Sequence, residues 1–259
     1  MADAVAIWNG FLQKTASLPG IRVDRNEYLT KELKLYCTQE QLDMIPSKRP
    51  YAIVNEDVID RVATACIRNH TIAVTSASAV AGIPGGIAML GTIPADLSQY
   101  YFHVLVLSQK LAYLYGFPNM VDNDSGELSD VALDMMTIFV GTVMGAGSAS
   151  QAIHSLAQKL AKQALEQLPK KALTKTAIFQ MAKPIAKMLG IKLTKKGFAQ
   201  AVSKAIPFIG ALASGGITVA TFLPGAKRLQ KELMAQRGLF ANEEINLTSY
   251  EKATETTAE

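Results

Sequence analysis

Charged side chains are absent from three long stretches of this chain. Residues 69–95, 135–158 and 205–226 contain no Asp, Glu, Lys or Arg. Runs of this length are long enough to cross or enter a bilayer, because about 20 apolar residues span its hydrocarbon core. The same runs are rich in Gly, Ala, Ser and Pro, which also allow helices to pack tightly inside a protein. The sequence leaves open whether these runs span a bilayer, dip into it or stay buried in protein.

Cysteine and aromatic residues are also scarce. The two cysteines, Cys37 and Cys66, have neither a CxxC nor a zinc-site spacing, so we expect free thiols in a reducing compartment. Aromatic residues make up only 7% of the chain, so small apolar residues fill much of the predicted core. A secretory signal is not expected, because Asp3 stands where such a signal is basic and no apolar segment follows. These features predict a location on the cytoplasmic side of the inner membrane, peripheral or partly inserted.

Positive charge is concentrated in one segment. Residues 159–204 contain eleven lysines and a single acid, Glu166, although the net charge of the whole chain is only +4. Such a segment is suited to anionic phospholipid, where each exposed lysine near the surface contributes about 1 kcal/mol. Nucleic acid is the less favoured partner, because the segment has no arginine and only two aromatic residues. An ordinary solvated helix face is the remaining alternative. The lysines expected to contact lipid headgroups are Lys162, Lys170, Lys171, Lys175, Lys183, Lys187, Lys195 and Lys196.

The spacing of apolar residues predicts helices nearly throughout, and no run alternates between apolar and polar residues as a half-buried strand does. We predict an all-α multi-helix bundle with Gly/Ala/Pro-rich apolar helical hairpins. Asp24 and Asn55 have the positions of helix N-caps, and Thr38 with Gln41 has the spacing of a capping box. The expected helices cover residues 3–16, 25–37, 94–115, 127–146, 148–168 and 174–204.

Glycine and proline are expected to bend or end several of these segments. Breaks at residues 82–86 and 91–94 divide the first uncharged run, so that a helical hairpin or a re-entrant loop is favoured over a straight span. We expect Gly116 and Gly190 to end helices and Pro184 to kink one. The domain organisation predicted from these features is an N-terminal helical extension (1–54), a main helical domain (55–235) and an acidic, disordered tail (236–259).

Several short segments follow one another in a definite order between residues 55 and 235. They are AGIPGG (81–86), TIPAD (92–96), YLYG (113–116), an acidic helix with Glu127, Asp130 and Asp134, a lysine-rich middle, and IPFIGALASGG (206–216). This order resembles the EcsC family of bacterial proteins. The resemblance implies an α-helical, membrane-associated protein connected with an ABC-type transporter, and it supplies no catalytic residues. Residues 1–54 lie outside it.

One predicted helix carries a polar stripe on an otherwise apolar surface. If this stripe is buried, its groups must find partners, either in a ligand-binding or proton-relaying network or simply at the helix start and on neighbouring helices. An acidic face on the next helix has the donors of a divalent-metal site, but the repeated Glu-xx-His pairs of di-metal bundles are missing, so a solvated face is favoured. The candidates for a polar core or ligand network are Asp96, Gln99, Tyr100, His103, Lys110, Asp130 and Asp134.

No pattern of catalytic residues supports an enzyme, a cofactor or a bound metal. The glycines before Thr92 have a phosphate-loop spacing but lack the lysine that such a loop requires. The leading hypothesis is a non-enzymatic, membrane-associated protein that contacts anionic phospholipid and is accessory to an integral membrane transporter or another envelope process. Two alternatives are a soluble bundle that binds a lipid or small hydrophobic ligand in a cavity, and a pore-forming protein with a sheathed hairpin.

Overall fold

A computed structural model describes residues 2–16, 18–75, 95–120, 128–162, 173–192 and 216–240 of the chain. The predicted all-α fold class is confirmed, since these ranges contain helices and no sheet. The elements are α1 (Ala2–Ala16), α2 (Arg25–Leu33), α3 (Gln39–Asp43), the 3-10 helix η1 (Pro50–Ala52), α4 (Glu56–Thr75), α6 (Ala95–Leu114), α7 (Asp130–Val143), α8 (Ala149–Leu160), α9 (Lys175–Lys192) and α11 (Gly216–Met234).

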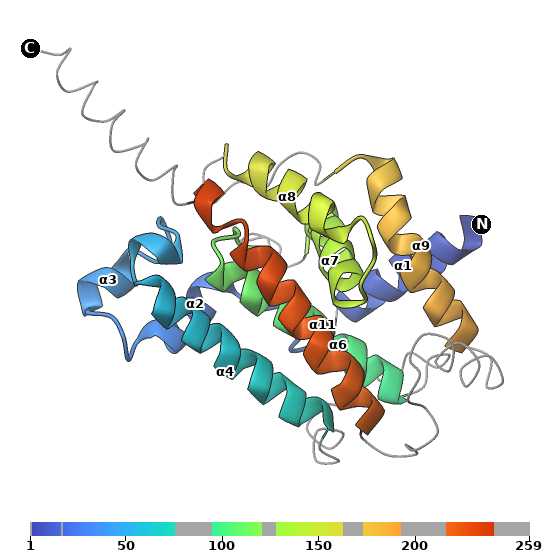
Figure 1. The fold of residues 1–259 in the computed structure, drawn as a ribbon, viewed down its shortest axis with the longest axis horizontal. Coiled ribbons are helices and arrows are strands. Elements are labelled where there is room, and N and C mark those ends of the chain that lie inside the picture. The colour runs from blue at the N-terminus through green and yellow to red at the C-terminus, as the bar shows by residue number, and fades with distance from the viewer. Residues whose placement is uncertain are drawn as a thin grey trace, which may run out of the picture.

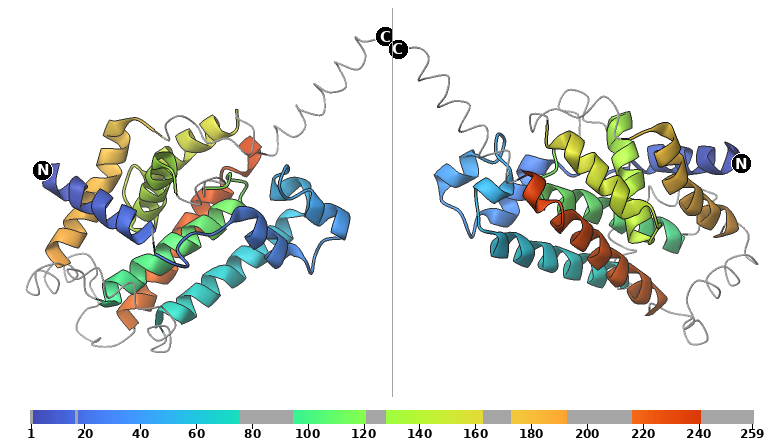
Figure 2. Two further views of the ribbon diagram at one scale, coloured as in Figure 1. Left: turned by 180° about the vertical axis from the view of Figure 1, so that it is seen from behind. Right: turned by 45° about the horizontal axis from the view of Figure 1, so that its top comes forward.

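Three long helices, α4, α6 and α11, pack against one another and form one side of the bundle (Figure 1). α4 runs antiparallel to both partners: its first turns meet the end of α11 through Arg237 and the end of α6 through Tyr115. α7 packs on α6 and α11 and also contacts α8 and α9. α1 lies along α9, and α2 lies on α6 (Figure 2). α6 therefore has neighbouring helices on several sides.

The helix starts follow the predicted caps. The side chains of Asp24 and Asn55 each accept a hydrogen bond from the backbone N–H three residues on, at 2.8 and 3.0 Å. Thr38 and Gln41 form both bonds of a capping box. These bonds satisfy N–H groups that a helix start otherwise leaves unpaired. Local sequence therefore determines where these helices begin.

The end of α6 at Gly116 is also confirmed. Gly116 has a φ of +88°, a conformation that side chains other than glycine rarely adopt. The backbone N–H of Phe117 donates to the carbonyl of Ala112 at 2.9 Å, and that of Gly116 donates to Tyr113 at 3.2 Å. This pair of bonds is the Schellman arrangement of a helix C-terminus.

Three predicted helix ends are wrong. α9 continues through Gly190 to Lys192, since a glycine within a helix costs only about 1 kcal/mol, which tertiary packing can offset. α2 stops at Leu33 instead of residue 37. Leu35 is 83% exposed, so its side chain makes no packing contact that would extend the helix. α8 ends at Leu160 and is followed by a turn at residues 161–162, whereas the rest of the predicted range to 168 lies outside the described residues.

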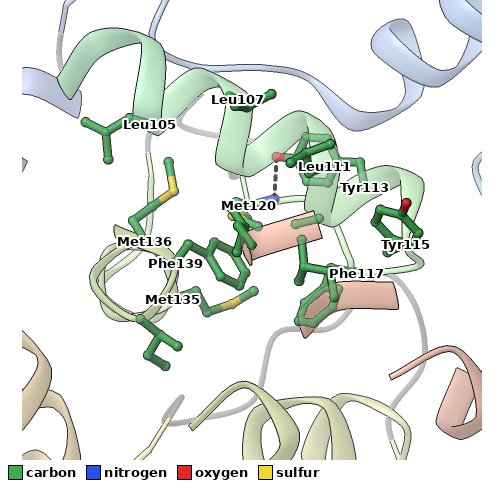
Figure 3. Close-up of a cluster of buried hydrophobic side chains, with 14 of the residues drawn as sticks. Leu105, Leu107, Leu111, Tyr113, Tyr115, Phe117, Met120, Met135, Met136 and Phe139 are labelled. Atoms are coloured by element: carbon green, nitrogen blue, oxygen red, sulfur yellow. Dashed lines mark hydrogen bonds between the residues drawn. The ribbon is translucent and has the colours of Figure 1, made fainter. Parts of the chain in front are cut away.

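The α7 part of the second uncharged run is buried in protein. Every side chain from Met135 to Val143 on α7 is buried, and the apolar stripe of α8 faces the same core. Figure 3 shows part of this core, where Met135, Met136 and Phe139 of α7 lie opposite side chains of α6. The first and third runs fall mostly outside the described residues, including the predicted hairpin around residues 81–94. In the described ranges, no helix is both long and apolar enough to cross a membrane.

Both ends of the described chain contribute to this core. Trp8 of α1 is fully buried, and its Nε1 donates to the Thr137 hydroxyl of α7 at 3.0 Å. Residues 236–240, which were predicted to belong to the disordered tail, are packed instead. The Phe240 ring is fully buried, lying 4.4 Å from the Arg49 guanidinium and 5.3 Å from the Phe117 ring. An aromatic residue that fills a pocket in the core thus extends the ordered chain beyond the predicted boundary.

Candidate functional site

Three polar side chains form a line between α4 and α6, which we call the His–Lys chain: Lys110, His70 and His103. The Lys110 ammonium lies 3.4 Å from His70 Nε2, and His70 Nδ1 lies 3.2 Å from His103 Nδ1. His103 and Lys110 are seven residues apart on α6 and so share one face of that helix. Both histidines are buried, and Lys110 is half-buried.

The lysine determines the tautomer of both histidines. A lysine ammonium can only donate, so His70 Nε2 must accept and the proton of neutral His70 must be on Nδ1. His70 Nδ1 then donates to His103 Nδ1, which places the proton of neutral His103 on Nε2. This Nε2 is buried and has no hydrogen-bond partner among the described residues. The chain therefore ends on an unpaired N–H donor.

The electrostatics keep both imidazoles neutral. Burial lowers the pKa of His70 to about 3, with a smaller effect from the Lys110 charge and from His103. Burial also lowers the pKa of His103 to about 4, with Lys110 as the second cause. The neutral state agrees with the tautomers that the hydrogen bonds require.

Tyr28 and Cys66 border the same cluster. The Lys110 Nζ lies 5.5 Å from the centre of the Tyr28 ring, and the Tyr28 hydroxyl interacts with the Cys66 thiol. Burial raises the pKa of both Tyr28 and Cys66, although the Lys110 charge acts in the opposite direction on the thiol. A buried thiol with a raised pKa is protonated near neutral pH and is a poor nucleophile. Both cysteines are free, as predicted.

This arrangement can donate a hydrogen bond to a carbonyl, carboxylate or phosphate oxygen at His103 Nε2. It is poorly suited to a metal, because Lys110 and the His70–His103 bond already occupy three of the four imidazole nitrogens. Among the described residues, no three His, Cys, Asp or Glu side chains are close enough to hold a metal ion. Its chemistry is that of a polar network in a helical core.

The structure brings together only part of the predicted polar network. Tyr100 points toward α11 instead, with its ring 5.8 Å from that of Phe222. The polar residues of α6 do not stay together because this helix has neighbours on several sides. Side chains that differ by only a fraction of a turn around its axis therefore reach different helices. Asp96 and Gln99 lie in the first turns of α6, and their side chains are outside the described part.

The two acids of α7 belong to a different environment. Asp130 is exposed in the first turn of α7, and Asp134 is half-buried with its pKa raised by burial and then by the Asp130 charge. Within the described ranges, neither is hydrogen-bonded to His70, His103 or Lys110. The predicted solvated acidic face describes Asp130 well.

His70 was not among the candidates predicted from the sequence. It lies at the start of the first uncharged run, and no motif includes it. A signal was nevertheless present, because Ile59, Cys66 and His70 recur at helical spacing on the buried stripe of α4. A polar residue on such a stripe requires a partner, and the partner comes from a helix distant in the sequence.

The predicted headgroup-binding lysines divide into three groups. Lys162, after α8, and Lys183, on α9, are exposed. Lys175 and Lys187 lie on α9, with side chains that are not described, and Lys170, Lys171, Lys195 and Lys196 are outside the described residues. α8 and α9 both pack on α7 (Figure 1).

Comparison with known proteins adds no relative. No family model, no curated protein and no solved structure matches the chain. Membership of the EcsC family therefore stays a prediction from the order of the sequence segments.

Proposed function

We propose that this protein is a non-enzymatic helical protein that attaches to an anionic phospholipid surface. The observation that carries the proposal is the outer face of α9. On this face, Lys183 and the 37% exposed Phe179 are about one helical turn apart. Lys175 and Lys187 continue the same four-residue spacing. Lysines beside an exposed aromatic ring are typical of helices that lie in a membrane interface.

The opposite face of α9 holds the helix in place. Met181, Ala182 and Ile185 are buried, and α9 packs against α1 and α7. The helix thus has an inner apolar side that belongs to the core and an outer side with charge. The resemblance to EcsC proteins supports the same function and suggests a transporter or another envelope process as its context.

The proposal is tested by reversing two charges on this face. Each lysine near an anionic surface contributes about 1 kcal/mol, so Lys183→Glu with Lys187→Glu should weaken binding by roughly 30-fold or more. The measurement is co-sedimentation of the full chain with vesicles of phosphatidylglycerol and phosphatidylcholine. Vesicles of phosphatidylcholine alone should bind the unaltered protein weakly.

A matched control is Lys31→Glu with Lys34→Glu, which makes the same change in net charge at exposed positions of α2 and its C-cap. This control should bind the vesicles nearly as well as the unaltered protein, apart from the loss that the change in net charge alone produces. Equal binding of the two double variants would show that α9 has no special part in attachment. Leakage of a trapped dye on binding would support the pore-forming alternative instead.

A further inference from the structure

The outer surface between α4 and α11 contains a groove that the functions above do not use. We call it the α4/α11 groove; it has a volume of about 480 Å³, and Ile67, Arg68 and Ile72 of α4 line it together with Leu223 and Lys227 of α11. Small-molecule sites commonly have volumes of about 300–1,000 Å³. The antiparallel pair of helices is visible at the front of Figure 1. The groove therefore has the size of a ligand site.

The groove is lined by three aliphatic side chains, by two threonines and a glutamine, and by two cations. Ile67 is buried, Leu223 is half-buried, and Ile72 is 58% exposed. A large aliphatic side chain that is exposed next to other apolar groups leaves surface in water that a ligand can cover. An acyl chain has the matching chemistry, because its burial removes apolar area from water without requiring hydrogen bonds.

The charge of the groove has a single sign. Arg68 and Lys227 both line it and are exposed, and no acidic side chain lines it. Within the described ranges, neither cation forms an ion pair, whereas the acids Glu56 and Asp60 at the start of α4 are bonded to Arg237. Two like charges on opposite walls favour an anion between them. A phosphate is well suited, because arginine binds it through a pair of hydrogen bonds and lysine as a point charge.

We infer that the α4/α11 groove binds one anionic phospholipid molecule as a monomer. Its phosphate lies between Arg68 and Lys227, and its acyl chain lies on Ile67, Ile72 and Leu223. The site is independent of the surface attachment proposed above. It uses different helices, and Figure 1 shows α4 and α9 at opposite sides of the molecule.

The test uses a short-chain phosphatidylglycerol kept below its critical micelle concentration, so that no membrane surface is present. Binding to the full chain is measured by isothermal titration calorimetry. We expect saturable binding that is at least tenfold weaker for a phosphatidylcholine of the same chain length and for inorganic phosphate. Arg68→Glu with Lys227→Glu should weaken binding of the phosphatidylglycerol at least tenfold, and Ile72→Ala should weaken it severalfold.

Two controls match these variants. Lys31→Glu with Lys34→Glu repeats the charge change away from the groove, and Leu35→Ala shortens another exposed aliphatic side chain. Both should bind as the unaltered protein does. Equal affinity for the two phospholipids would overturn the headgroup assignment, and equal affinity for inorganic phosphate would overturn the role of the acyl chain. Unaltered binding by the groove variants would overturn the site, whatever the vesicle experiment on α9 gives.

Discussion

A single lysine organises the polar interior of this protein. Lys110 is the only lysine or arginine between positions 69 and 158, and its ammonium determines which ring nitrogen carries the proton in two buried histidines. The consequence is an unpaired N–H at His103 Nε2. A buried donor without an acceptor is unfavourable by about 1–3 kcal/mol, so an oxygen atom of a ligand at this position would remove that cost.

The two histidines should make the protein sensitive to mild acid. Their pKa values in the folded protein, about 3 for His70 and about 4 for His103, lie below the ordinary value of 6.5. The unfolded chain therefore binds more protons, and the free energy of unfolding should fall as the pH is lowered from 6.5 toward 4. The slope should be on the order of 1 kcal/mol per pH unit for each histidine.

Urea unfolding between pH 6.5 and 5 measures this slope above the range in which carboxylates titrate. His70→Gln with His103→Gln should flatten it. A slope in this variant equal to that of the unaltered protein would show that the buried pair is not the source of the acid sensitivity.

Close contact between α7 and α11 depends on one glycine. A Cβ atom built on Gly225 would lie 2.6 Å from the carbonyl oxygen of Val143 and 2.7 Å from its Cγ1. Real atoms do not approach so closely, so the two helices would have to separate. Pro224 lies immediately before this glycine, and α11 is nonetheless continuous from Gly216 to Met234. α11 therefore stays helical through Pro224 and Gly225 where it contacts α7.

Gly225→Ala should therefore destabilise the fold by about 1–3 kcal/mol through overpacking. Gly10→Ala is the matched change on α1, where a Cβ would meet no atom within 4 Å. Because alanine is the better helix former, Gly10→Ala should stabilise the protein by about 0.5–1 kcal/mol. Chemical denaturation monitored by circular dichroism measures both changes. Effects of equal sign would contradict the packing account.

The bundle is closed by a buried arginine that connects segments far apart in the chain. The Arg49 guanidinium donates to the carbonyls of Gly116, after α6, and of Leu160, at the end of α8. It also lies against the Phe240 ring. Arg49, which lies between α3 and α4, thus holds the ends of two helices and the last described residues together.

Arg49→Ala should destabilise the whole protein by about 3 kcal/mol or more, because hydrogen bonds to charged groups contribute about 1.5–3 kcal/mol each and two buried carbonyls lose their donor. Arg49→Lys should rescue only part of this loss, because an ammonium cannot present two donors in the fixed geometry of a guanidinium. Arg61→Ala, at an exposed position of α4, should change stability by less than about 0.5 kcal/mol. Thermal unfolding of the three variants checks the order.

The sequence by itself determined the helical class, the N-caps at Asp24, Thr38 and Asn55, and the end of α6 at Gly116. These features depend on interactions within a few residues, so local side-chain chemistry is sufficient to predict them. His103 and Lys110 were also identified as candidates, because both lie on one apolar helix.

Only the tertiary structure decided which helices face one another. It paired His103 with His70, turned Tyr100 toward α11, buried the uncharged run of α7 in protein and left a cationic groove between α4 and α11. The spacing of apolar residues predicts that one face of a helix is buried, but it does not predict which segment covers that face. The partners are determined by packing between segments 33 or more residues apart, as for His70 and His103, and packing of this kind leaves no local pattern in the sequence.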